Sequence, residues 1–239
     1  MSVALLIPAA GQGKRMGKDI KKQYIKLKEI PLLARTINSF EQCSALFEQI
    51  ILLIPADDYK FVKNSILPGV KENLSRKIEL LAGGNSRRET VEKGLKELRS
   101  DINYVMIHDG ARPFIECSLV EEVLEKVKIS DAVSVGTAVK DTIKIQNESG
   151  LVERTLDRDK LVAVQTPQAF SCAVIKRAHK EIDEQEMAPD DACLVEKLGY
   201  EVSIIRGSYD NIKITTPFDL KIAELLLEEK EFKKGSWEK

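Results

Sequence analysis

Short apolar segments alternate with helical patterns along this chain, and that alternation limits its fold more than any other feature. The apolar segments are nearly continuous, which is typical of strands that are covered on both faces. Between them, apolar residues recur with helical spacing, as at Val91, Leu95 and Leu98. Repeated strand–helix–strand units with right-handed crossovers predict an α/β fold with a mostly parallel, twisted sheet. Strands are expected at Val3–Pro8, Gln49–Ile54, Lys77–Leu81, Tyr104–His108, Ala132–Val139 and Glu201–Ile205.

Helix starts are marked by short polar patterns. Ser86 with Glu89, and Ser118 with Glu121, each match the S-x-x-E capping box, in which both side chains bind free N–H groups of the first turn. Pro217 follows Thr216 and predicts the first turn of a last helix.

One segment departs from the alternation of strands and helices and predicts a β-hairpin. Thr142–Ile145 and Leu151–Thr155 alternate apolar and polar residues around the turn sequence of residues 147–150. A hairpin that projects from an α/β body needs cover, so it is either a dimerisation arm or a plain surface hairpin. We expect one domain over residues 1–239, with residues of about 137–159 forming the arm.

Composition gives no support to several classes of function. The 239 residues carry a formal net charge of -1, which does not favour binding to nucleic acid or to an anionic membrane. No apolar run approaches the roughly 18–20 residues that span a bilayer. The four cysteines are scattered and lack metal-site spacing, so neither a zinc site nor a disulfide framework is expected. The expected location is the reducing cytoplasm.

The first predicted strand leads into a glycine-containing loop over residues 8–16. Gly11 and Gly13 let the backbone approach a ligand closely, and successive N–H groups there can bind an anion. The glycines alone are equally compatible with a tight turn. No G-K-[ST] follows, so this is not a P-loop, and the third glycine of a dinucleotide-binding loop is absent. The following basic residues favour a polyphosphate ligand: Lys14, Arg15, Lys18, Lys21 and Lys22.

The segment His108–Pro113 follows another predicted strand, at the edge of a parallel sheet where ligands bind. Asp109 can supply one oxygen ligand to Mg²⁺, and Arg112 can bind a phosphate. A helix-capping Asp and a surface Arg are the alternative. His108 is expected to be structural rather than a base, and His179, on an amphipathic helix, is expected to be exposed.

Three further polar segments are less informative. Two of them allow a functional and a structural interpretation, and the third allows no interpretation. The loop of residues 83–90 could read the edge of a nucleobase, or it could simply begin a capped helix. Lys213 could reach a phosphate, or it could be a solvated lysine. The polar segment of residues 165–168, which contains Pro167, suggests no particular chemistry.

Together these segments resemble one family. The ordered motifs P-A-A-G-x-G-x-R-M, K-Q-Y, G-G-x-x-R, H-D-x-A-R-P, D-T-I-K, Q-T-P-Q and D-N-I-K-I-T are similar to those of 2-C-methyl-D-erythritol 4-phosphate cytidylyltransferases of the non-mevalonate isoprenoid pathway. The resemblance spans residues of about 3–227. It implies a Rossmann-like body with helices on both faces of the sheet, and a homodimer that exchanges a β-arm. It also implies transfer of CMP from CTP to 2-C-methyl-D-erythritol 4-phosphate, with Mg²⁺ and release of pyrophosphate.

The resemblance also implies roles for individual residues. The residues expected to be catalytic are Arg15, Lys22, Arg158 and Lys213. Those expected to hold CTP are Ala9, Ala10, Gly11, Gly13, Gly84, Asn85, Thr90 and Gly110. Those expected to bind the substrate are Arg112, Thr142, Arg158, Asp210 and Lys213, and Asp109 is the expected metal ligand. In the family, Thr142 and Arg158 come from or lie next to the arm and serve the neighbouring subunit's site.

Three positions depart from the usual family pattern. Asn85 stands where Asp is most common and Thr90 where Ser is, and both changes keep an acceptor or a hydroxyl. Pro189 stands where many members have Thr, so no substrate role is carried over to it.

Two rival functions are open. A ribitol 5-phosphate cytidylyltransferase would catalyse the same chemistry on another polyol, but those relatives tend to have L-A-G-G and V-R-P. This chain has Pro8-Ala9-Ala10-Gly11 and Ala111-Arg112-Pro113 instead. A non-catalytic nucleotide sensor could lose Arg15, Lys22 or Asp109, and all three are present.

Overall fold

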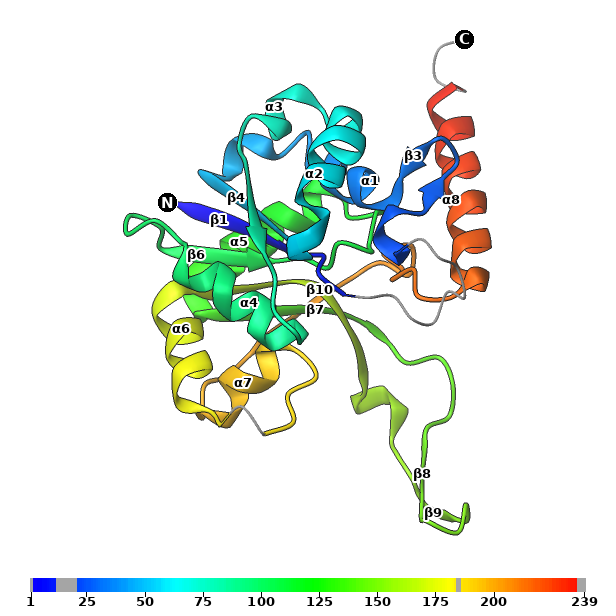
Figure 1. Ribbon diagram of the computed structural model, residues 1–239. Helices are drawn as coiled ribbons and strands as arrows, with labels where there is room; N and C mark the ends of the chain where they lie inside the picture. Colours follow the sequence, from blue (N-terminus) through cyan, green and yellow to red (C-terminus); the bar gives the residue numbers. More distant parts are fainter. Residues whose placement is uncertain (1, 12–20, 184–185, 236–239) are drawn as a thin grey trace.

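A seven-stranded sheet forms the centre of the computed structural model, which describes residues 2–11, 21–183 and 186–235 (Figure 1). In sheet order, its strands are β11 (Ser203–Arg206), β7 (Ala132–Ala138), β10 (Val162–Ser171), β6 (Tyr104–Ile107), β1 (Val3–Pro8), β4 (Gln49–Ile54) and β5 (Ile78–Ala82). β10 is antiparallel to both of its neighbours, and all other neighbouring strands are parallel. The expected mostly parallel α/β sheet is therefore confirmed.

One face of the sheet is covered by α1 (Leu32–Asn38) and α5 (Cys117–Ser130). Leu5 and Ile7 of β1 point to this face and pack in the same apolar core as these helices. Because alternate residues of a strand point to opposite faces, the residues between them belong to the other side.

That other face is covered by α4 (Arg87–Lys96), α6 (Cys172–Glu181) and α7 (Asp191–Lys197). Ala4 and Leu6 of β1 pack with them in a second apolar core. With both faces of the strand buried, every position is apolar, which explains the continuous hydrophobic segments in the sequence.

A smaller layer lies beside the sheet. α8 (Pro217–Gly235) packs against β2 (Lys26–Leu27), which pairs with β3 (Ile30–Pro31), and Leu27 and Ala223 share a third apolar cluster there. In the connection from β4 to β5 lie the short helices α2 (Tyr59–Phe61) and α3 (Glu72–Ser75). None of the helices in the described part of the chain is both long and apolar enough to cross a membrane.

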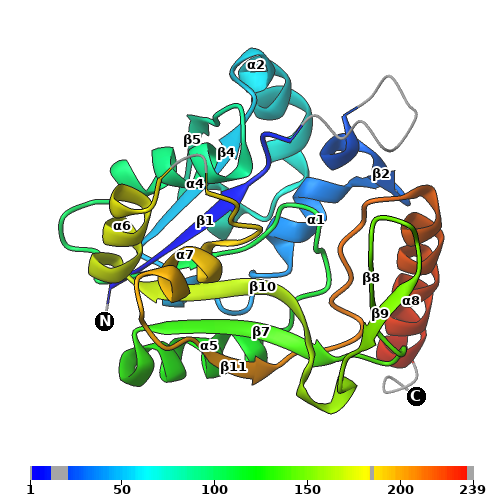
Figure 2. The ribbon, with the colours of Figure 1, turned by 90° about the horizontal axis from the view of Figure 1, so that it is seen from below.

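β10 is the strand of the seven-stranded sheet that the sequence pattern did not predict. It lies in the middle of the sheet between β6 and β7, and Figure 2 shows it running beside β7. Pro167 has no N–H to donate to a neighbouring strand, and proline normally argues against a central strand. The structure accommodates it at an irregularity, since the register with β7 shifts between Gln165 and Gln168.

The predicted helix starts have different outcomes. Ser86 caps α4, since its side chain accepts from the N–H of Glu89, and α8 begins at Pro217 as predicted. The capping box at Ser118 is wrong. α5 begins earlier, at Cys117, because the N–H of Val120 already bonds the carbonyl of Glu116. Glu116 is therefore the N-cap residue, and no side chain caps this helix.

The predicted hairpin is present as β8 (Lys144–Gln146) and β9 (Val152–Thr155), which pair antiparallel. Figure 1 shows it projecting from the body, on the segments that leave β7 and enter β10. Gly150 in its turn has a φ of 77°, a backbone conformation that glycine adopts without steric cost. Leu151 and Val152 are exposed, so the hairpin presents apolar side chains outside the core.

Candidate active site

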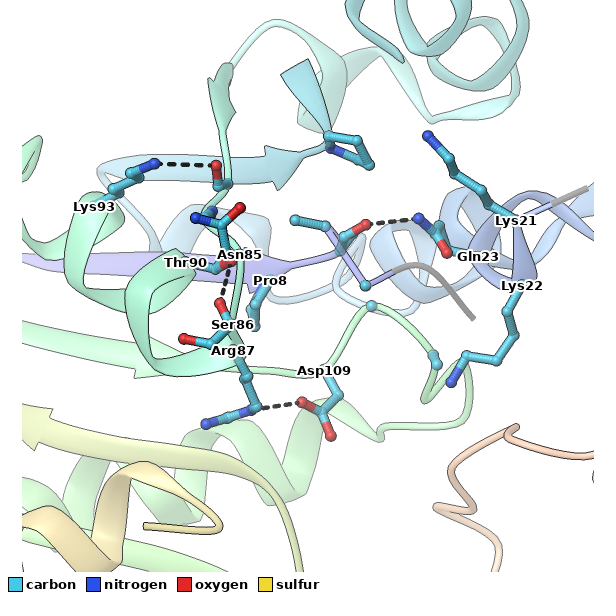
Figure 3. A pocket seen from close by; sticks show the side chains of 18 of the residues that line it. Pro8, Lys21, Lys22, Gln23, Asn85, Ser86, Arg87, Thr90, Lys93 and Asp109 are labelled. Carbon is cyan, nitrogen blue, oxygen red and sulfur yellow. Dashed lines mark hydrogen bonds and ion pairs between the residues drawn. The ribbon is translucent and has the colours of Figure 1, made fainter. Parts of the chain in front are cut away.

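The carboxyl ends of β1, β4, β5 and β6 open on one pocket of about 990 Å³ (Figure 3). These four strands are parallel, so the loops that follow them meet at the same edge of the sheet. The pocket is lined by residues 8–11, 55–57, 83–87 and 109–111 from these loops, and by Lys21, Lys22, Gln23, Thr90, Lys93, Lys213 and Thr215.

The loop after β1 supplies backbone to this pocket. The N–H of Ala9 bonds the carbonyl of Leu53 at 2.7 Å, and the buried side chain of Gln23 donates to the carbonyl of Ala9 at 2.8 Å. Both backbone groups of Ala9 are therefore fixed at the edge of the pocket, and Ala10 and Gly11 line the pocket next to it. The predicted site residues Gly13 and Arg15 lie outside the described residues.

A 3₁₀ turn at Lys22–Tyr24 brings basic side chains to the same pocket. The ammonium of Lys21 lies 2.7 Å from Asp58, and the hydroxyl of Tyr24 donates to the same carboxylate at 2.8 Å. Burial, and then Asp58, raise the pKa of Tyr24, so the phenol stays protonated as a donor. The turn is thus anchored on both sides of Lys22, and Figure 3 shows Lys21 and Lys22 leaving it in different directions.

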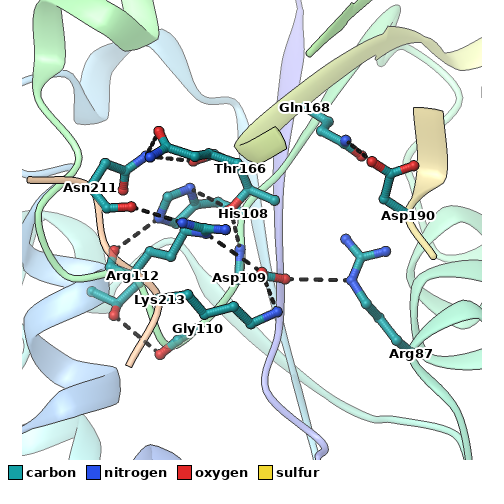
Figure 4. Close-up of polar contacts among 12 residues, drawn as sticks. Arg87, His108, Asp109, Gly110, Arg112, Thr166, Gln168, Asp190, Asn211 and Lys213 are labelled. Atoms are coloured by element: carbon teal, nitrogen blue, oxygen red, sulfur yellow. Dashed lines mark hydrogen bonds and ion pairs between the residues drawn. The ribbon is translucent and has the colours of Figure 1, made fainter. Parts of the chain in front are cut away.

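Asp109 is the centre of a group of charges (Figure 4). Its carboxylate lies 2.7 Å from Nζ of Lys213, 3.4 Å from Nε of Arg87 and 3.7 Å from Nε of Arg112. Burial by itself raises the pKa of Asp109, but the positive charges of Arg87 and Lys213 outweigh burial and hold the pKa well below its ordinary value. Asp109 is therefore an ionised carboxylate surrounded by an excess of positive charge.

Arg112 and His108 are fixed behind Asp109. Arg112 is buried, and its Nη1 donates to the carbonyl of Asn211 at 2.8 Å. His108 is fully buried, with its ring nitrogens 3.0 Å from the carbonyl oxygen of Arg112 and 3.3 Å from the hydroxyl of Thr166. Burial lowers the pKa of His108 to about 4, so the ring is neutral near pH 7. This position agrees with the structural role expected for His108.

The loop after β5 begins a capped helix, as one interpretation of residues 83–90 predicts, and it also lines the pocket. Ser86 is the residue that caps α4. The hydroxyl of Thr90 accepts from the N–H of Gly84 at 3.0 Å and donates to the carbonyl of Ser86 at 2.8 Å. The N–H of Asn85 bonds the carboxylate of Glu89 at 2.6 Å, while the side chain of Asn85 is exposed at the pocket.

Four of the five predicted substrate residues do not line this pocket, and one of them is the buried Arg112. Thr142 and Arg158 belong to the arm segment and are exposed, and Nη1 of Arg158 donates to the carbonyl of Lys140 at 3.1 Å. Asp210 lies in the turn after β11, where its N–H bonds the hydroxyl of Ser208 at 3.1 Å. Lys213, which follows Asp210 in the segment after β11, does reach Asp109 within the same subunit.

The structure also brings in residues to which the sequence motifs gave no individual role. Arg87 bridges Asp109 and Asp191, and the hydroxyl of Thr166 accepts from the N–H of Asp109 at 3.0 Å. The expectation that His179 is exposed is wrong. α7 packs on α6 and covers this side chain, whose Nε2 lies 3.3 Å from Asp191. Helical spacing shows which residues form the apolar face of a helix. It does not show which further side chains a neighbouring helix buries.

Comparisons with known proteins agree with this geometry. Residues 3–229 match the family of 2-C-methyl-D-erythritol 4-phosphate cytidylyltransferase. Proteins of that name from Alkaliphilus metalliredigens and Alkaliphilus oremlandii are 42% and 44% identical, and the alignments cover 99% and 94% of this chain and 98% and 94% of theirs. The solved 4-diphosphocytidyl-2C-methyl-D-erythritol synthase of Anaerococcus prevotii superposes with a TM-score of 0.82 at 30% identity, covering 95% of this chain and 98% of that one. The chain therefore belongs to the 2-C-methyl-D-erythritol 4-phosphate cytidylyltransferase family.

Proposed function

We propose that the pocket at the carboxyl ends of β1, β4, β5 and β6 carries out the reaction of this family. A phosphate oxygen of 2-C-methyl-D-erythritol 4-phosphate attacks the α-phosphorus of CTP, the bond from that phosphorus to the β-phosphate breaks, and pyrophosphate leaves. One observation carries the proposal. Seven of the eight residues expected to hold CTP line this pocket, and Asp109, Lys22 and Lys213 line it as well. Family membership supports the nucleotidyltransferase class of the enzyme.

Charge stabilisation and positioning supply the catalysis. The attacking phosphate oxygen is already ionised at neutral pH, so no general base is needed, which suits a site whose histidine is buried and neutral. Two polyanions repel each other, and the site must offset that repulsion. Lys22 and Arg15 act at the α-phosphate, and Lys213 and Arg112 hold the phosphate of the acceptor. Fixed charges in a pocket shielded from water stabilise the transition state strongly.

The donor set fits one Mg²⁺ that is shared with the nucleotide. In the described part of the chain, no group of three or more His, Cys, Asp and Glu side chains is placed to bind a metal. Asp109 offers one ionised carboxylate at the pocket, and Mg²⁺ typically takes one or two carboxylates together with substrate phosphates and waters. When bound, the ion would neutralise phosphate charge. Asp109 would hold it, and Lys213 would shift from the carboxylate toward the acceptor phosphate.

The arm completes the site in a homodimer under this proposal. Thr142 and Arg158 lie away from the pocket of their own subunit, and the hairpin carries exposed apolar residues, as an exchanged arm requires. The four cysteines are free thiols, which supports a cytoplasmic location.

A turnover assay tests the function and separates it from its nearest rival. The protein is mixed with CTP and Mg²⁺, and pyrophosphate release is measured with either 2-C-methyl-D-erythritol 4-phosphate or ribitol 5-phosphate. We expect release with the methylerythritol compound and little with the ribitol compound. Faster turnover of ribitol 5-phosphate would make the rival correct, and no release with either would leave a nucleotide sensor.

A close contact between two loops provides a first mutational prediction. A Cβ on Gly83 would lie 2.3 Å from the Cβ of Ala10, so the loops after β1 and β5 touch only because residue 83 has no side chain. We expect Gly83→Ala to move these loops apart, to raise KM for CTP at least about tenfold and to lower stability by about 1–3 kcal/mol. Steady-state kinetics and thermal unfolding measure both effects.

Gly69→Ala is the matched control for this prediction. A Cβ there meets Ala34 at 3.5 Å, an ordinary contact, and Gly69 does not line the pocket. We expect this variant to keep the KM of the unmodified protein. A normal KM for CTP in Gly83→Ala would show that the close approach of the two loops does not matter for binding.

A further inference from the structure

The segment of residues 189–192 received no functional role from the sequence, yet the structure connects it to Asp109. Asp191 is the first residue of α7, and its side chain is 1% exposed. Nη1 of Arg87 lies 2.7 Å from Oδ2 of Asp191, while Nε of the same guanidinium lies 3.4 Å from Oδ1 of Asp109. Arg87 is thus held between two buried carboxylates, and one of them is the candidate metal ligand (Figure 4 shows its contact with Asp109).

Asp191 is itself held rigidly. The carboxylate of Asp190 caps α7 by accepting from the N–H of Cys193 at 2.9 Å, and it accepts from the side chain of Gln168 on β10 at 2.8 Å. His179 approaches the other carboxylate oxygen of Asp191 at 3.3 Å. The start of α7 is therefore attached to the central sheet, and the position of Asp191 is set independently of any ligand.

The planar fork of arginine explains what this attachment does. A guanidinium presents five N–H donors in a fixed geometry, and it binds a carboxylate or a phosphate best with two of them. While Asp191 engages Nη1, Arg87 meets Asp109 through the single contact at Nε. Without Asp191, Arg87 could turn to pair with Asp109 through two donors, or with an incoming phosphate. Either movement would change how the Asp109 carboxylate is presented to the pocket.

We propose that Asp191 is a positioning residue that, through Arg87, fixes the Asp109 carboxylate in the orientation that receives the divalent cation. This inference rests on the proposed function, in which Asp109 is the metal ligand. Residues that orient a metal ligand typically change metal affinity or activity by about 10–100-fold when they are replaced.

The test measures cation binding directly. Asp191→Asn keeps the shape of the side chain and removes its charge, and binding of Mn²⁺ in the presence of CTP is followed by electron paramagnetic resonance. We expect the affinity for Mn²⁺ to fall by about 10–100-fold and kcat to fall, with KM for the acceptor nearly unchanged. In an Arg87→Gln background, Asp191→Asn should add little further loss, because its effect passes through Arg87.

Arg88→Gln is the matched control. Arg88 is the next residue of α4 and also ties it to the end of α6, through the carbonyls of Ile182 and Asp183, but it does not line the pocket. The Arg88→Gln variant should bind Mn²⁺ with the affinity of the unmodified protein. An equal loss of Mn²⁺ affinity in Arg88→Gln would show general loosening between these helices and would overturn the proposal.

The remaining outcomes separate the two levels of inference. Absence of turnover in the unmodified protein contradicts the proposed function. Normal Mn²⁺ affinity in a folded, correctly assembled Asp191→Asn protein, in an enzyme that does turn over, overturns the positioning role alone. If Asp191→Asn does not fold, Arg87→Lys gives the same test, because one ammonium cannot bridge the two carboxylates in the way a fork does. Normal Mn²⁺ affinity in Arg87→Lys would then overturn the proposal.

Discussion

Replacing Lys22 by alanine should lower kcat by about 10²–10³-fold, the cost of losing one charge that acts on a transition state. Lys22 lines the pocket, on a turn that Gln23 ties to Ala9 and that Tyr24 ties to Asp58. A charge that is held in place before the reaction stabilises negative charge without reorganisation. We therefore expect KM for CTP to change much less than kcat, as measured by steady-state kinetics with saturating acceptor.

Lys26→Ala is the control for this prediction. Lys26 lies on β2, a few residues further along, and its side chain is exposed and 3.6 Å from Glu29. It removes the same charge from the protein without touching the pocket, so kcat should be unchanged. If Lys22→Ala kept its kcat and only raised KM, Lys22 would bind the nucleotide and not act on the transition state.

Mixing two inactive variants should restore activity if the arm serves the neighbouring subunit. Arg158→Ala should be nearly inactive because the acceptor phosphate loses a cation, and Lys22→Ala should be nearly inactive because of its own site. In a mixed dimer, one site carries both defects and the other carries neither. With random pairing of equal amounts, about half of the dimers are mixed and about a quarter of the sites are intact.

The measurement is pyrophosphate release after the two variants exchange subunits, compared with each variant alone. Recovery to about a quarter of the unmodified rate is the expected result for a shared symmetric dimer. No recovery, with exchange verified by differently tagged subunits, would place Arg158 outside the neighbouring site. The exposed position of Arg158, away from the pocket of its own subunit, is the reason to expect recovery.

The sheet and its ligand edge were predictable because their determinants are local. Strands such as β1 and β4 are continuous apolar segments, and the polar loops that follow parallel strands must meet at one edge. Asp109, Gly84 and Lys213 were accordingly found from short motifs. β10 was missed because Pro167 contradicts the local pattern of a central strand, and only the register shift against β7 shows how the sheet accommodates it.

The sequence by itself determined six of the seven strands of the central sheet, the hairpin and the family, since each depends on neighbouring residues or on ordered motifs. The tertiary structure decided which side chains share an environment. Arg87 and Asp191 are far apart in the chain and come together because α4 and α7 cover the same face of the sheet. The same packing buries His179, and it makes Asp109 one of two carboxylates on one guanidinium. Burial and charge pairing depend on the positions of all surrounding groups, and a local pattern carries no information about groups that are distant in the chain.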